Sequence, residues 1–177
     1  MRPSFSVLDK AALRLSPRRG TFGRIGGGFR SLPFALATVA LATAGIGTRL
    51  LLLPLIRFLN AHSKSFVKFP YDSSHRVSFL FLAILFAPVF ETLLCQLLPF
   101  AVARKFGILA RYPWCVVIVS GLFFGLQHIY SVGYMLWTAV CGVVLALGFL
   151  YSRSFVRGFW VVAFAHVLMN LYASLPA

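Results

Sequence analysis

Five long apolar runs dominate this sequence of 177 residues and constrain what it can fold into. Each run is close to the roughly 20 residues that a helix needs to cross a bilayer. Hydrophobic residues make up 60% of the chain and charged residues only 11%, and a soluble domain could not bury so much apolar surface. We therefore predict an all-α fold, a polytopic transmembrane bundle of about five spanning helices. The runs cover residues 32–56, 77–102, 113–130, 132–151 and 156–174.

The first 30 residues differ from the rest of the chain. They carry seven Lys and Arg residues, a single acid and several glycines, and they show no apolar periodicity. This composition predicts a basic, flexible N-terminal tail over 1–30, followed by a transmembrane domain over 31–177. An Arg-rich, acid-poor start is also typical of an organellar transit peptide, which is the alternative interpretation.

Positive charge is the second strong bias of the sequence. Seventeen Lys and Arg residues face three Asp and Glu residues, which gives a net charge of +14. In a soluble protein this excess would indicate nucleic-acid binding. Here most basic residues lie between apolar runs, so they indicate topology and contact with anionic lipid. We expect the bilayer as a partner and no nucleic acid.

The distribution of these charges predicts an orientation. With a cytoplasmic N-terminus, the inner segments carry twelve Lys and Arg residues, whereas the outer segment 57–76 carries four, or five with Arg49. The positive-inside rule then places the N-terminus in the cytoplasm and the C-terminus outside. Small size and the lack of a clear eukaryotic sorting signal lead us to expect the inner membrane of a bacterial cell.

Glu91 is the only acidic residue within an apolar run. A carboxylate inside a membrane costs several kcal/mol, so it is a functional candidate by default. Removed from bulk water, it can act as a general base near neutral pH. The alternative is a purely structural ion pair with Arg49 or Arg104.

Two histidines and an asparagine are the other polar candidates within the runs. His128 follows Phe124 by four residues and Asn170 follows His166 by four, so each pair shares one helical face. A lone buried histidine is more often a hydrogen-bonded core residue, but polar groups from three spans converge in lipid. Together with Glu91 they would supply a base, an imidazole and donors for an oxyanion, which suits amide hydrolysis.

Other hydrolytic sites find less support. The sequence has no serine nucleophile elbow and no helix with two histidines four residues apart, so its spacing supports no metal ligand set. The sequence does not decide whether a divalent metal such as zinc serves as a cofactor. Gly121 and Gly125 form a GxxxG pattern, which we interpret as close packing within the bundle rather than as a dimer site.

Three segments resemble motifs of the CPBP family, the CAAX protease and bacteriocin-processing (Abi) intramembrane proteins. Residues 87–96 (APVFETLLCQ) resemble the first motif, residues 124–128 (FGLQH) the second and residues 166–170 (HVLMN) the third. The motifs occur in the family's order, on separate predicted helices, and the resemblance covers about 77–174.

The resemblance implies a metalloprotease-like intramembrane endopeptidase that acts on a membrane-associated or prenylated protein substrate. It implies that Glu91 activates water together with His128, and that His166 and Asn170 stabilise the oxyanion. Phe124 would pack beside the site as a supporting residue.

The first motif departs from the family pattern. The usual Glu-Glu-x-x-x-Arg is Glu91-Thr92-x-x-x-Gln96 here, so a carboxylate and an arginine are both replaced by uncharged groups. Thr92 and Gln96 are four residues apart and could bond to each other, supporting the site without an ion pair. The departure also suits the alternative function, a non-catalytic membrane regulator or scaffold of the same family. A small transporter is a third alternative, but no internal repeat supports it.

The depths in the membrane that we expect for Glu91 and His128 disagree. Glu91 lies ~21 Å from the outer end of its run, and His128 lies ~22 Å from the inner end of its own, at ~1.5 Å per residue. In a core of ~30 Å the two depths differ by more than ~10 Å. A kink at Pro88 or shifted helix ends would have to close this gap.

Overall fold

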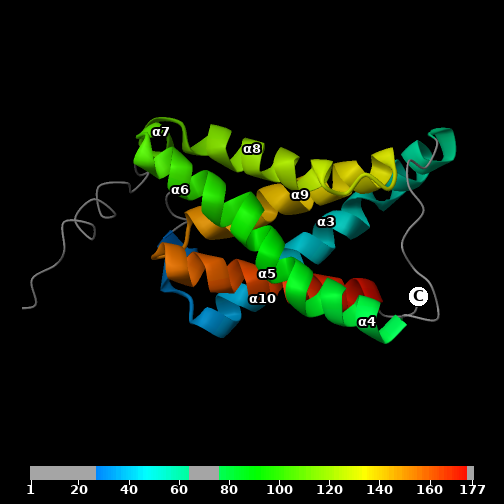
Figure 1. The fold of residues 1–177 in the computed structure, drawn as a ribbon, viewed down its shortest axis with the longest axis horizontal. Helices are drawn as coiled ribbons and strands as arrows, with labels where there is room; N and C mark the ends of the chain where they lie inside the picture. Colours follow the sequence, from blue (N-terminus) through cyan, green and yellow to red (C-terminus); the bar gives the residue numbers. More distant parts are fainter. Residues whose placement is uncertain (1–26, 64–75, 175–177) are drawn as a thin grey trace, which may run out of the picture.

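The computed structural model describes residues 27–63 and 76–174, and within them every regular element is helical. The predicted all-α bundle is confirmed (Figure 1). Most of the predicted tail, residues 1–26, lies outside the described residues, and residues 27–31 form a helical turn. The elements are α3 (Phe34–His62), α4 (Arg76–Phe81), η2 (Leu82–Phe86), α5 (Ala87–Thr92), η3 (Leu93–Leu97), α6 (Leu98–Lys105), α7 (Ile108–Arg111), α8 (Pro113–Leu126), α9 (Val132–Leu150) and α10 (Phe155–Ser174).

Four helical segments of the described chain are long and apolar enough to cross a membrane. They are Phe34–His62, Leu82–Lys105, Val132–Leu150 and Phe155–Ser174. The fifth predicted span corresponds to α8, which is apolar but has only 14 residues. At ~1.5 Å per residue it extends ~21 Å, less than the ~30 Å core of a bilayer.

The segments α4 to α6 follow one another without a break and form a single helical rod. Two five-residue π-helical segments, η2 and η3, interrupt its α-helical pattern. Each ends just before a proline-containing turn, Pro88 after η2 and Pro99 after η3. Because proline has no N–H to donate and its ring crowds the preceding turn, a widened turn is a physical response to it. The two prolines thus set the local geometry around Glu91.

The GxxxG pattern of α8 packs against α9. A Cβ placed on Gly121 would lie 2.8 Å from Val143 N, and one on Gly125 would lie 2.8 Å from Met135 O. These backbone contacts leave no room for a side chain, so the two glycines allow the helices to approach closely. The interpretation as packing within the bundle is confirmed.

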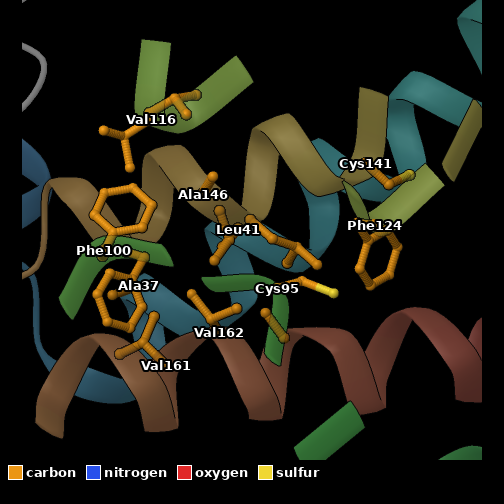
Figure 2. Close-up of a cluster of buried hydrophobic side chains, with 14 of the residues drawn as sticks. Ala37, Leu41, Cys95, Phe100, Val116, Phe124, Cys141, Ala146, Val161 and Val162 are labelled. Atoms are coloured by element: carbon orange, nitrogen blue, oxygen red, sulfur yellow. The ribbon is translucent and has the colours of Figure 1, made fainter. Parts of the chain in front are cut away.

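All the long helices contribute to one apolar core. Figure 2 shows Phe100 from α6 and Val161 and Val162 from α10 beside Leu41 of α3 and Ala146 of α9. Much of the outer surface of the same helices is also apolar and exposed, as a lipid-facing surface requires.

Candidate functional site

The structure brings Glu91, His128 and His166 together from three elements. Glu91 lies on α5, His128 lies in the turn just after α8, and His166 lies on α10. Glu91 Oε2 is 3.6 Å from His166 Nε2 and 4.0 Å from His128 Nε2. The side chains of Glu91 and His128 are mostly buried, and that of His166 is 4% exposed.

The predicted mismatch in depth between Glu91 and His128 is therefore absent. Helix α8 ends at Leu126, before the end of the apolar run, and His128 N donates to Gly125 O in the turn that follows. On the other side, Glu91 lies on the short helix between the two π-helical segments, in a rod that is not a regular α-helix. Both helix ends and helix geometry differ from the straight spans that the depth estimate assumed.

Phe124 and its carbonyl orient His128. His128 Nδ1 lies 2.8 Å from Phe124 O, and because a carbonyl oxygen only accepts, Nδ1 is the protonated nitrogen. The Nε2 lone pair of a neutral ring then faces Glu91. The Phe124 ring lies 4.8 Å from the His128 ring and 5.2 Å from the His166 ring, centroid to centroid. Phe124 thus has the position beside the site that the sequence predicted for it.

Asn170 ties α10 to the rod that carries Glu91. Its Nδ2 donates to Ala83 O in η2 at 2.7 Å. One amide hydrogen is therefore used on the backbone, and the carboxamide keeps a second one. Asn170 lies one helical turn from His166, as the spacing predicted, and its hydrogen bond is to the rod's backbone rather than to Glu91.

The predicted bond between Thr92 and Gln96 is wrong. Both side chains are fully buried, and neither Thr92 Oγ1 nor Gln96 Nε2 and Oε1 has a hydrogen-bond partner within the described residues. Gln96 lies inside η3, where the helix advances with i→i+5 rather than i→i+4 bonding. Four-residue spacing alone therefore does not bring the polar atoms of Thr92 and Gln96 together.

The alternative pairing of Glu91 with an arginine is also absent. The Arg49 guanidinium lies over the Trp137 ring at 5.3 Å, and that of Arg104 lies over Phe155 at 5.1 Å. Glu91 is the only acid of the described segments, and its ion-pair contacts are to the two histidines.

Two neighbours of the site were not predicted. Gln127 Nε2 donates to Cys95 Sγ at 2.8 Å, which ties the end of α8 to η3. The Tyr134 ring of α9 lies 5.8 Å from the His128 ring. Gln127 lies inside the second motif, and that was its only sequence signal; Tyr134 had none.

The residues of the site do not fit a metal centre. No group of three or more His, Cys, Asp or Glu side chains in residues 27–63 and 76–174 is arranged to hold a metal ion.

Comparison with known proteins identifies the family of this chain. No curated protein and no solved structure matches the chain. The family model described as "Type II CAAX prenyl endopeptidase Rce1-like" matches residues 73–172, more than half of the chain. The match includes Glu91, His128, His166 and Asn170, and it agrees with the resemblance found in the sequence. The chain therefore belongs to the Rce1-like family of type II CAAX prenyl endopeptidases.

Proposed function

We propose that this protein is an active intramembrane endopeptidase that hydrolyses a peptide bond of a membrane-associated, prenylated protein. The observation that carries the proposal is the approach of two imidazoles to one mostly buried carboxyl group, at 3.6 and 4.0 Å. A membrane-buried acid with two imidazole partners is expensive to maintain, and hydrolysis is the chemistry of the family to which the chain belongs.

In the proposed mechanism Glu91 and His128 activate water. Their 4.0 Å separation is longer than a hydrogen bond, and a water bridging the two would complete the contact. His128 Nδ1 donates to Phe124 O, so its Nε2 accepts one water hydrogen while Glu91 accepts the other. As the water oxygen attacks the scissile carbonyl carbon, Glu91 takes the proton and then delivers it to the leaving amine.

His166 and Asn170 are proposed to stabilise the negative charge that develops on the carbonyl oxygen. His166 is held against Phe124 and is almost fully buried, so its imidazole is shielded from bulk water. Asn170 is fixed by its bond to Ala83 O and keeps one amide hydrogen for the oxyanion. Donors fixed before the reaction begins are the arrangement that such stabilisation requires.

A second candidate function is a non-catalytic regulator or scaffold for other membrane proteins. The observation that favours it is the pair of fully buried, unpartnered side chains Thr92 and Gln96, where the family pattern has a carboxylate and an arginine. A family member that has lost its charged support could keep the fold and lose the reaction.

We further propose a bacterial inner membrane with a cytoplasmic N-terminus and an external C-terminus. Arg30, Arg104, Arg153 and Arg157 support this orientation, because the segments that carry them gather at one end of the bundle (Figure 1). A concentration of arginines at one end is typical of the cytoplasmic side.

The deciding experiment compares new protein termini in membranes that contain the wild type or Glu91→Gln at equal abundance. The exchange keeps size and polarity but removes the base. His62→Gln is the matched control, because His62 also follows a phenylalanine by four residues, with Nδ1 2.8 Å from Phe58 O, but lies at the exposed end of α3. Termini present with wild type and His62→Gln but absent with Glu91→Gln would establish proteolysis. Identical termini in all three would favour the regulator.

A further inference from the structure

Three segments that are distant in the sequence and that carry four arginines lie together where α10 begins. We call Arg30, Arg104, Arg153 and Arg157 the arginine cluster. The N-terminal segment, the end of α6 and the start of α10 lie at the same end of the molecule (Figure 1). The Arg104 guanidinium lies over Phe155, the first residue of α10, at 5.1 Å.

Two of these arginines are held in place by backbone carbonyls of the N-terminal segment. Arg153 Nε donates to Arg30 O at 2.6 Å, and an Arg157 terminal nitrogen donates to Leu32 O at 2.7 Å. A guanidinium has five N–H donors, so each keeps several after this bond. The positions of the two charged groups are thus fixed, while most of their donors stay free for another partner.

Two of these N–H donors have no acceptor among residues 27–63 and 76–174. Arg30 Nε and Arg157 Nε are both shielded from water and have no hydrogen-bond partner among the described residues. A buried donor of a charged group that lacks an acceptor is costly. A bound ligand with oxygen atoms would supply the hydrogen-bond acceptors that Arg30 Nε and Arg157 Nε lack.

No acid in the described part of the chain compensates the charge of the cluster. The described residues include one acid, Glu91, and it contacts the histidines of the site. In addition, Arg157 lies in the first turn of the 20-residue helix α10, where the helix dipole favours an anion and disfavours a cation. An anion bound at this end of α10 would offset both the charge of Arg157 and the helix dipole.

We propose that the arginine cluster binds the phosphate of an anionic phospholipid headgroup. A phosphate offers several acceptor oxygens and pairs with guanidinium groups in a bidentate manner. The location favours a lipid over a soluble anion, because the cluster lies at the ends of membrane-spanning helices, beside aromatic residues of the interface. Trp160, one turn after Arg157, is exposed, as in an aromatic belt.

The test measures lipid binding by the full-length protein in detergent, by native mass spectrometry of lipid adducts. The probes are phosphatidylglycerol, phosphatidylcholine and inorganic phosphate. The variant is Arg153→Gln/Arg157→Gln. The matched control is Arg111→Gln/Lys105→Gln, which removes the same charge from the same end of the bundle, outside the cluster. Thermal unfolding of each variant in phosphatidylcholine alone reports any loss of the bonds to Arg30 O and Leu32 O.

We expect the wild type to retain phosphatidylglycerol over phosphatidylcholine, and the cluster variant to lose about tenfold or more of that preference. The control variant should keep most of it. Equal losses in both variants would show a diffuse charge effect and overturn the proposal, as would a wild type without preference. Inorganic phosphate that displaces the lipid at millimolar concentration would show a free-phosphate site and would also overturn the lipid assignment.

Discussion

Glu91 Oε2 lies closer to His166 Nε2, at 3.6 Å, than to His128 Nε2, at 4.0 Å. The resemblance to known motifs pairs Glu91 with His128 and assigns His166 to the oxyanion. The geometry gives Glu91 two imidazole neighbours, of which His166 is the more buried. The carboxyl group is therefore held between a partly accessible histidine and an almost fully buried one.

This arrangement predicts that both histidines are needed for proteolysis. His128→Gln and His166→Gln should each lower the rate about a hundredfold or more, the effect usual for a lost acid–base or oxyanion group. His62→Gln should leave the rate unchanged. The measurement is the initial rate of appearance of the termini that depend on Glu91, at equal protein abundance.

A different ranking would change the assignment of roles. If His166→Gln kept a rate close to that of the wild type while His128→Gln did not, His166 would be a core residue that fills the space beside Phe124. A loss equal to that of Glu91→Gln in both variants would support a single unit of three residues, whose effects are not additive.

The fold class, and the convergence of Glu91 with His128 and His166, could be predicted from hydrophobicity and from the few polar residues within the apolar runs. Apolar runs of spanning length leave few alternatives to a helical bundle. An acidic residue within such a run is costly, so it indicates a functional site. What the sequence could not provide was depth. A straight-helix estimate separated Glu91 from His128 by more than ~10 Å, because it could not place the ends of the span that carries Glu91, which are Leu82 and Lys105. With these ends Glu91 lies ~21 Å from Lys105 and His128 lies ~22 Å from Pro113, at ~1.5 Å per residue, so the two depths agree.

The sequence also could not decide whether Thr92 bonds to Gln96. Four-residue spacing places two side chains on one side of a helix, but it does not fix the rotamers that would bring their polar atoms together. Gln96 also lies inside the π-helical segment η3, just before the turn that contains Pro99, where hydrogen bonding differs from that of a regular α-helix. A sequence shows where its prolines are. Whether the helix has a kink, a break or a π-helical turn at a proline depends on how the neighbouring helices pack against it.

Unpartnered burial predicts that Thr92→Val will not destabilise the protein. The Thr92 hydroxyl is fully buried without a partner, so its replacement by a methyl group should leave the free energy of unfolding unchanged or raise it by about 1 kcal/mol. The control is Thr138→Val on α9, whose buried hydroxyl donates to Tyr134 O at 2.9 Å. That exchange should cost about 1 kcal/mol. Thermal unfolding of the two variants provides the comparison, and equal destabilisation would indicate a buried water bound to Thr92.

We expect that the hydrogen bond from Asn170 to Ala83 O stabilises the fold, and this effect can be measured without an assay of proteolysis. Asn170→Asp keeps the shape but, when ionised, places an acceptor against the acceptor Ala83 O, where an N–H now donates at 2.7 Å. We expect a loss of about 1–3 kcal/mol and faster hydrogen exchange of the backbone amides in η2. Ser174→Ala, which removes an exposed bond to Asn170 O, should change stability by less than about 0.5 kcal/mol. Unchanged exchange in η2 would show that Asn170 does not hold the rod.

The contact between α8 and α9 gives the sharpest prediction about stability. Gly125→Ala would place a Cβ 2.6 Å from the Ala139 Cβ and 2.8 Å from Met135 O, so the two helices would have to separate. We expect a loss of about 2 kcal/mol or more, at the upper end of what overpacking costs. Gly47→Ala on α3 is the control, because its Cβ meets nothing within 4 Å.

Since glycine in a helix interior is less favourable than alanine, Gly47→Ala should raise stability by about 0.5 kcal/mol. Unfolding midpoints in the same detergent would distinguish the two glycines.

Because His128 follows the end of α8, a separation of α8 from α9 should also move His128 away from Glu91. Gly125→Ala should therefore lose proteolysis even at temperatures where it stays folded. A folded Gly125→Ala variant with full activity would show that the packing of α8 on α9 does not position His128.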